Sequence, residues 1–320
     1  MAEVTTERIR ALRERTGAGM MDVKRALEQA GGNEEEAIRI LREKGLAQAA
    51  KRATRKALEG VIETVVLPER GRAAIIELNC ETDFVARTGD FRALARALAE
   101  HAAFVGDEVD PRDPSAHADP RGESSVARVD AFLDRPLTGK PGLTARELLT
   151  ETAARLGEHV RLRRFVTFVT GARMVETYVH GDGRIGVLLE AEVSPQEAAD
   201  RAEVRAMVRD LAMQVAAFRA EYVDRSQVPE AVKAREREIY RTAALNEGKP
   251  ERVVDRIVEG RLEKFYQEVC LLDQPYMRDG SVSVSRHLQQ ASGALGVKVG
   301  LRRFARFERA EQLASDDQQE

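Results

Sequence analysis

The fold of this chain is decided by the stretch Val61-Ile-Glu-Thr-Val-Val-Leu-Pro-Glu-Arg-Gly-Arg-Ala-Ala-Ile-Ile-Glu-Leu78. Its two ends, Val61–Leu67 and Ala74–Leu78, are rich in β-branched and apolar residues, a composition typical of strands. Between them, Pro68–Gly71 has the composition of a tight turn. The stretch therefore predicts a β-hairpin. A helix is predicted after it, because apolar residues recur at three- and four-residue spacing from Phe91 to Ala102.

This hairpin and helix recur once along the chain. Glu63 and Glu77 are 14 positions apart, and Glu176 and Glu190 are also 14 positions apart, with matching Glu-Thr and Gly-Arg pairs in both copies. Such a repeat indicates two similar halves, each a β-hairpin packed on helices. Strands do not alternate with helices as in βαβ units, so the predicted fold class is α+β.

Residues 3–50 predict a module of three short helices separated by glycine-rich turns. Asn33 is an N-cap candidate ahead of three glutamates, which suit the first turn of a helix. The third helix is expected to end at Gly45. The basic run Lys51–Lys56 is interpreted as a solvated linker, with binding of an acidic partner surface as the minority alternative.

A protruding antiparallel helical hairpin is predicted between Ser226 and Val269, with its turn at Gly248-Lys249-Pro250. Each arm would be roughly 27 Å long at the α-helical rise. The apolar residues expected to face one another across the hairpin are Val232, Ile239 and Ala243 on the first arm and Val254, Ile257, Leu262 and Phe265 on the second.

The remaining segments complete the predicted architecture. Helices are expected near 123–133 and 144–157, a strand over 160–169, and a mixture of strand and short helix over 282–307; residues 107–122 are interpreted as an exposed acidic loop. The expected domains are 1–54 for the three-helix module, 55–171 for the first core subdomain, 172–225 and 270–305 for the two parts of the second, 226–269 for the helical hairpin and 306–320 for a polar tail.

The composition excludes several classes of protein. With 51 Lys+Arg against 54 Asp+Glu the net charge is −3, which argues against a protein that coats nucleic acid. Two cysteines, Cys80 and Cys270, cannot form a disulfide framework. No signal peptide and no stretch of membrane-spanning length is seen, so a cytoplasmic protein without membrane contact is expected.

No catalytic motif is convincing. Gly181–Gly186 matches G-x-G-x-x-G, but Val187 and the residues after it continue as a strand, so a dinucleotide site is rejected. No Walker A or zinc-ligand pattern occurs, and neither a cofactor nor a metal is expected. Glu81 and Asp83 lack a third group for acid–base chemistry. A nucleophilic Cys80 is the third hypothesis for function, with a buried, inert thiol as the favoured interpretation.

Two apolar features fit no catalytic motif. Thr82-Asp83-Phe84-Val85 lies between the first hairpin and its helix, where the second copy has Ser194-Pro195-Gln196-Glu197. Either Phe84 fills its local core, or it is an exposed wedge beside an acid, as partner-inserting loops are. Met20-Met21 has the same two interpretations, core filler or contact surface.

These residues resemble the elongation factor Ts family of bacteria, the nucleotide exchange factors of elongation factor Tu. The resemblance is carried by Leu12-Arg-Glu-Arg-Thr-Gly-Ala-Gly-Met-Met-Asp22, by Glu77-Leu-Asn-Cys-Glu-Thr-Asp-Phe-Val85, and by Tyr178-Val-His-Gly with Arg184-Ile-Gly-Val-Leu188. Val258–Phe265 and Gln274-Pro275 follow the family pattern further on. It covers essentially the whole chain; the stretch 107–122 and the polar tail depart from it.

The resemblance implies the function and its residues. The N-terminal helices would be a ubiquitin-associated-like (UBA-like) module that docks on the GTPase. Thr82, Asp83, Phe84 and Val85 would displace Mg²⁺ from the nucleotide site of elongation factor Tu, so that GDP leaves and GTP can bind. The expected partner contacts are Arg13, Met20, Met21, Lys24, Leu156, Gly157 and His180. The chain would then not be an enzyme, because it makes and breaks no bond.

Two points stay open at this stage. A non-exchanging helical adaptor is the alternative from another functional class, with the core serving as scaffold. The hairpin at 226–269 could pair between copies of the chain or contact the partner instead.

Overall fold

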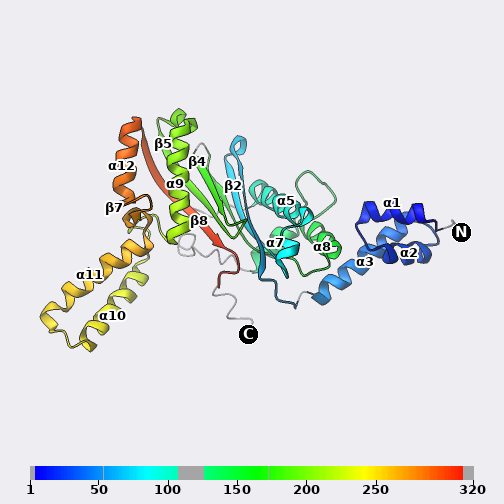
Figure 1. Ribbon diagram of the computed structural model, residues 1–320, viewed down its shortest axis with the longest axis horizontal. Coiled ribbons are helices and arrows are strands. Elements are labelled where there is room, and N and C mark those ends of the chain that lie inside the picture. The colour runs from blue at the N-terminus through cyan, green and yellow to red at the C-terminus, as the bar shows by residue number, and fades with distance from the viewer. Residues whose placement is uncertain (1–3, 53, 107–125, 172, 313–320) are drawn as a thin grey trace. The chain divides into compact units, whose positions relative to one another are not determined.

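The computed structural model describes residues 4–52, 54–106, 126–171 and 173–312. The chain forms two compact units. The first holds residues 1–61, 76–101 and 124–164, and the second holds 62–75, 102–123 and 165–320. The predicted acidic loop at 107–122 and the end of the tail, from residue 313, lie outside the described residues. Figure 1 labels the elements.

The first unit begins with the three predicted helices, α1 (Thr6–Thr16), α2 (Met20–Gln29) and α3 (Glu34–Arg52). Thr5 caps the start of α1, and Gly17 ends it in the left-handed conformation with φ 67°. The core of the three helices contains Ile9, Leu12, Val23, Ala26, Leu27 and Ala37. The predicted helical module is therefore present.

The predicted end of the third helix at Gly45 is wrong, because α3 continues to Arg52. A Cβ atom at Gly45 would lie 3.1 Å from Cβ of Ala154, so this glycine permits a close approach to another helix. Lys51 and Arg52 occupy the last turn of α3, where cations favour the helix dipole. The basic run is thus partly helical.

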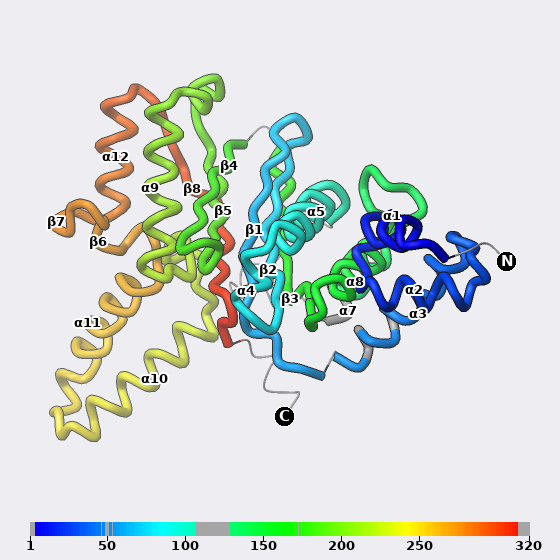
Figure 2. The backbone as a smooth tube through the Cα atoms, turned by 45° about the vertical axis from the view of Figure 1, so that its right-hand side comes forward, coloured from blue at the N-terminus to red at the C-terminus, as the bar shows by residue number. Residues whose placement is uncertain are grey.

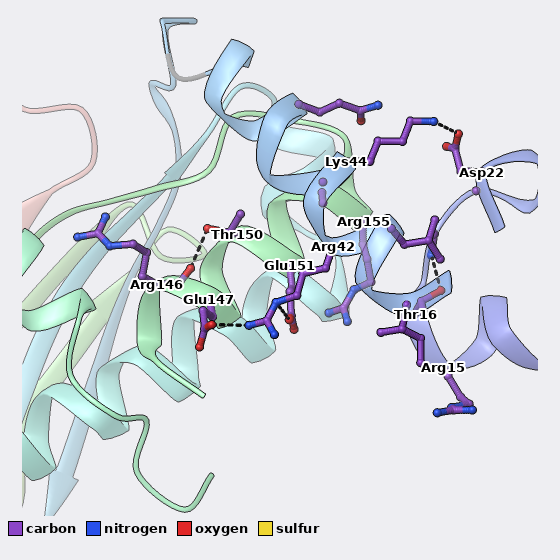
Figure 3. Close-up of a pocket in the computed structure, with 17 residues that line it drawn as sticks. Arg15, Thr16, Asp22, Arg42, Lys44, Arg146, Glu147, Thr150, Glu151 and Arg155 are labelled. Carbon is purple, nitrogen blue, oxygen red and sulfur yellow. Dashed lines mark hydrogen bonds and ion pairs between the residues drawn. The ribbon is translucent and has the colours of Figure 1, made fainter. Parts of the chain in front are cut away.

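The helix beside Gly45 is α8 (Ala145–Leu156), which begins with a capping box between Thr144 and Glu147. Arg42 of α3 contacts Glu147 at 2.5 Å and Glu151 at 3.3 Å, as Figure 3 shows. Two further helices are α5 (Gly89–Val105) and α7 (Val126–Leu133). They match the helices predicted after the first hairpin and near 123–133.

The first sheet has the strand order β1-β2-β3, with β1 at Glu59–Leu67, β2 at Arg72–Cys80 and β3 at Arg161–Val169. A 3₁₀ turn, η1 (Pro68–Arg70), joins β1 to β2, which confirms the predicted hairpin. Gly71 ends that turn at φ 58°, and a Cβ atom there would lie 2.4 Å from the carbonyl oxygen of Gly171. Glycine is therefore required at this turn.

The second unit contains an antiparallel sheet of order β4-β5-β8, formed by β4 (Met174–His180), β5 (Ile185–Ser194) and β8 (Lys298–Glu308). The turn Gly181–Arg184 joins two paired strands, so the rejection of a dinucleotide fingerprint is confirmed. Helix α9 (Ala202–Phe218) packs on β4 and β5, and α12 (Val284–Leu295) packs on α9 and β8 (Figure 1). The short elements are η2 (Gln196–Asp200), η3 (Leu271–Asp273), β6 (Pro275–Tyr276) and β7 (Asp279–Ser283).

The helical hairpin consists of α10 (Glu230–Asn246) and α11 (Glu251–Val269), which run side by side in Figure 2. Its contact face contains Ala244, Val254, Val258 and Leu262, with Tyr240, Ile257, Phe265 and Tyr266 against them. The predicted face of the first arm is wrong by one residue at Ile239 and Ala243, whereas Val232 packs beside Phe265 as expected. Ile239 is 47% exposed, because Tyr240 and Ala244 occupy the inner positions.

The architecture is thus a mixed α+β fold with small antiparallel sheets. Among the described residues, no helix is long and apolar enough to cross a membrane. The same residues contain no group of three His, Cys, Asp or Glu side chains that could hold a metal ion.

Candidate functional site

The segment Thr82–Val85 begins a short helix, α4 (Asp83–Ala86), immediately after β2. Thr82 is its N-cap, with extended backbone, and its hydroxyl oxygen accepts a hydrogen bond of 3.4 Å from the backbone N–H of Val85. The sequence predicted a loop here. A threonine followed by an acid at the first helical position is instead a helix start, since the threonine accepts a free backbone N–H and the negative charge of the acid suits the positive end of the helix dipole.

Hydrogen bonds from neighbouring residues hold α4 at both ends. At its start, the thiol of Cys80 donates to the carbonyl oxygen of Thr82 at 3.2 Å. At its end, the hydroxyl of Thr88 donates to the carbonyl oxygen of Val85 at 2.8 Å, and Nε of Arg92 donates to that of Ala86 at 3.0 Å. The backbone of α4 is therefore fixed before any partner binds.

The side chain of Phe84 points away from this fixed backbone and is 81% exposed. The interpretation as a filler of the local core is therefore wrong, because the ring lies in solvent. Asp83 beside it forms an ion pair of 3.2 Å with Arg87 on the surface. A rigidly presented, solvated aromatic ring is a feature of partner-binding sites.

Two other predicted contacts, Leu156 and Gly157, lie at the end of α8 in the same unit. Leu156 is half-buried, and Gly157 ends the helix in the left-handed conformation with φ 76°. The next residue, Glu158, accepts hydrogen bonds from Glu81 and Thr82. Gly157 therefore lies next in the chain to a residue that bonds to the segment Thr82–Val85.

The predicted N-terminal contact residues also lie at exposed positions of the first unit. Met20 and Met21 are 47% and 57% exposed, because α2 buries Val23 and its other apolar residues instead. Arg13 and Lys24 are exposed as well. The interpretation of the two methionines as core filler is therefore wrong.

A cavity of about 410 Å³ lies between the three-helix module and α8 (Figure 3). Its charged groups largely pair with one another, as Lys44 does with Asp22 at 2.5 Å and Arg42 does with the two glutamates of α8. Met20 and Met21 do not line it. The cavity lies within the first unit, and its lining includes none of the predicted site residues.

His180 lies in the second unit, at the exposed end of β4. The hydroxyl oxygen of Tyr178 is 2.9 Å from its Nδ1 atom, and the two rings stack with centroids 6.0 Å apart. This contact fixes the direction of the imidazole at the turn. His180 is therefore an ordered surface group.

Comparison with known proteins identifies the family. A model of the family "Elongation factor TS" matches residues 81–311. Elongation factor Ts of Aquifex aeolicus is 44% identical over 305 residues, covering 95% of this chain and 97% of that protein. Elongation factor Ts of Clostridium tetani is 39% identical, covering 98% and 96%, and that of Clostridium perfringens strain SM101 is 40% identical with the same coverage. The chain belongs to the elongation factor Ts family. Elongation factor Ts is the nucleotide exchange factor of elongation factor Tu in translation elongation.

Within this elongation factor Ts fold, neither cysteine is placed for nucleophilic chemistry. Both thiols are buried, and Cys80 donates to a backbone carbonyl. Burial raises the pKa of Cys270 to about 12, with Asp273 adding to the shift. The hypothesis of a Cys80 enzyme is therefore not supported by the geometry, since a reactive thiol is an accessible thiolate.

Three residues around the segment were missed or misjudged from the sequence. Glu158 was not singled out, because the residues that it bonds lie 77 and 76 positions away in the chain. Glu81 was weighed only as an acid or base, but its carboxylate accepts the backbone N–H of His159 at 2.6 Å. Arg55 of the connector pairs with Glu81 at 3.4 Å. These contacts join positions up to 104 residues apart, as in the bond between the ring of His159 and the carbonyl oxygen of Arg55.

Proposed function

We propose that this chain releases GDP from elongation factor Tu by means of the segment Thr82–Val85, which displaces the Mg²⁺ ion of the nucleotide site. The observation that carries the proposal is the 81% exposure of Phe84 on an anchored helix. An exposed aromatic ring on fixed backbone can enter a partner without a cost of ordering the loop. Phe84 is the wedge, Asp83 guides its approach, and Thr82 and Val85 hold the short helix that carries both.

The energetic logic is that of linkage. Mg²⁺ bridges and neutralises the phosphates of a bound nucleotide, so its displacement weakens the whole site. A factor that binds the nucleotide-free GTPase more tightly than the GDP-bound form lowers the affinity for GDP by the same ratio. A tenfold loss of GDP affinity requires ~1.4 kcal/mol of differential binding, an amount that one buried aromatic contact can supply.

The remaining predicted contacts have supporting roles in the proposal. Exposed Arg13, Met20, Met21 and Lys24 dock the UBA-like module on the GTPase domain. Leu156 and Gly157 extend the contact around Phe84, and His180 makes a second contact from the other repeat. The chain forms no bond with its partner, needs no cofactor or metal of its own and works in the cytoplasm without nucleic acid. The proposal also includes the domain boundaries stated in the sequence analysis and a role of residues 226–269 in self-association.

The experiment is stopped-flow release of a fluorescent GDP from elongation factor Tu at a series of concentrations of the full-length chain. We expect Phe84→Ala to lower the maximal release rate at least about tenfold, and to change the half-saturating concentration much less, because the wedge acts in the step of nucleotide release. Phe218→Ala is the matched control, since this ring is also exposed, at 46%, but lies at the end of α9. An unchanged rate of GDP release for Phe84→Ala would contradict the wedge role.

A further inference from the structure

The carboxylate of Glu158 holds the start of α4 from a distant part of the chain. Its Oε2 atom accepts hydrogen bonds from the backbone N–H groups of Glu81 and Thr82, both at 3.1 Å. Its Oε1 atom accepts a bond of 2.6 Å from the hydroxyl of Thr82. Bonds to a charged acceptor are stronger than neutral ones, so three of them fix the direction in which α4 leaves β2.

Glu81, directly before the segment, in turn binds the chain that follows α8. Glu81 accepts the backbone N–H of His159 at 2.6 Å, so each loop offers a carboxylate to the backbone of the other. We name this arrangement of Glu81, Thr82, Glu158 and His159 the carboxylate clasp. It joins the segment Thr82–Val85 to the end of α8, both in the first unit.

The clasp differs from the other anchors of α4 in its origin. The bonds from Cys80, Thr88 and Arg92 all come from residues within a few positions of the segment. Glu158 is 76 positions away from Thr82. Local bonds can keep α4 helical, whereas a bond from another element is needed to set its orientation on the rest of the unit.

We propose that Glu158 is a positioning residue for nucleotide exchange: through the clasp it orients α4 so that Phe84 enters the partner at the productive angle. This inference rests on the proposed function of Thr82–Val85. The carboxylate points to the protein's own backbone, so its loss changes the presentation of Phe84 rather than a contact with the partner. A small misplacement of a group that acts in the transition state lowers a rate more than an affinity.

The first test is amide hydrogen exchange of the free full-length chain. Glu158→Gln keeps the shape of the side chain and replaces one acceptor oxygen by an N–H₂ donor. We expect the amides of Glu81 and Thr82 to exchange at least about tenfold faster in this variant. Glu151→Gln, on helix α8 seven positions before Glu158 and paired with Arg42 at 3.3 Å, is the matched control and should leave these amides unchanged. Unchanged amides in Glu158→Gln would overturn the clasp.

The second test is the release of fluorescent GDP from elongation factor Tu. For Glu158→Gln we expect the maximal rate to fall about tenfold and the half-saturating concentration to stay within about threefold. Glu158→Asp, which keeps the charge on a shorter side chain, should recover part of the rate. A normal rate for Glu158→Gln beside a slow rate for Phe84→Ala would overturn the positioning role alone. Normal rates for both variants would overturn the function proposed for the segment, and the positioning role with it.

Discussion

Glu190 on β5 and Arg303 on β8 face one another in register and form a buried ion pair, in which Nε of Arg303 donates to the carboxylate at 2.5 Å. The first repeat contains its counterpart, since Nε of Arg164 on β3 donates to the buried carboxylate of Glu77 at 2.7 Å. Each half of the core therefore carries a buried glutamate that depends on an arginine of the neighbouring strand.

We expect Arg303→Met to destabilise the chain by about 2–3 kcal/mol, because it removes one of the two arginines that pair with the buried carboxylate of Glu190; the other, Arg173, stays at 2.6 Å. The matched control is Arg302→Met on the same strand. Arg302 pairs with Glu192 at the surface, so its loss should change the free energy of unfolding little. Urea unfolding measures the stability of both variants. The double variant Glu190→Gln with Arg303→Met should recover part of the stability that Arg303→Met loses. Equal unfolding midpoints for the two single arginine variants would contradict this prediction.

Phe84→Ala is expected to leave the thermal midpoint within about 2 °C of the parent, because a side chain that is solvated in the free chain contributes little to folding. The contrast is Phe91→Ala on α5, which removes a fully buried ring and should cost about 3–5 kcal/mol. Calorimetry of the two variants separates these outcomes. A loss at Phe84 comparable with that at Phe91 would mean that the ring packs inward in solution.

Replacing both Met20 and Met21 by alanine is expected to weaken binding to elongation factor Tu at least about tenfold, because two exposed apolar side chains would lose their contact area. The maximal rate of GDP release should stay near that of the parent, the opposite of the result expected for Phe84→Ala. Met277→Ala, another exposed methionine, serves as the control in the same titration. If affinity is retained, the proposed docking surface of the module is incorrect.

Much of the fold could be predicted because local patterns are strong. The hairpin around Pro68–Gly71 and the turn at Gly248 followed from proline, whose φ is fixed, and from glycine, which adopts the positive φ that these turns need. The repeat was visible in the equal 14-residue spacings that end at Glu77 and at Glu190, but the sequence did not show why glutamates stand there. Their burial depends on arginines of other strands, and Glu190 and Arg303 are 113 positions apart.

The site could be predicted only in part, for the same physical reason. A single sequence located Phe84 but could not decide its exposure, which depends on how β2 and α4 are packed. The face of α10 was misplaced by one residue, because Ile239 and Tyr240 are both apolar enough to be buried. Glu158 was missed, since its role exists only once α8 is placed beside the segment Thr82–Val85.

Both cysteines are expected to resist thiol reagents in the folded chain. The thiols are buried, and the raised pKa of Cys270 leaves little thiolate at mildly alkaline pH. Titration with a disulfide reagent should detect almost no thiol in the native protein and both thiols in concentrated guanidinium chloride. Rapid modification of one native thiol would reopen the hypothesis of a reactive Cys80.

His101 on α5 predicts a pH dependence of stability. Its side chain is buried beside the ring of Phe132, and the backbone N–H of Thr138 donates to its Nδ1 atom at 3.2 Å. That bond requires Nδ1 to be an unprotonated acceptor, so the imidazole is neutral. Burial, and secondarily the charge of Arg135, lowers the pKa of His101 to about 4 from the usual 6.5.

The folded state therefore takes up this proton less readily than the unfolded chain. The stability linked to His101 is fully present above pH 6.5, and it is lost as the pH falls toward 4, because only the unfolded chain is protonated in that interval. At about 1.4 kcal/mol per pH unit, the loss amounts to about 3 kcal/mol. His101→Asn keeps an acceptor for the N–H of Thr138 but cannot titrate, so its free energy of unfolding should fall less steeply over this interval. Urea unfolding at a series of pH values measures how steeply the free energy of unfolding falls for the parent and for His101→Asn. Equal slopes for the two proteins would show that the imidazole does not stay neutral in the folded chain.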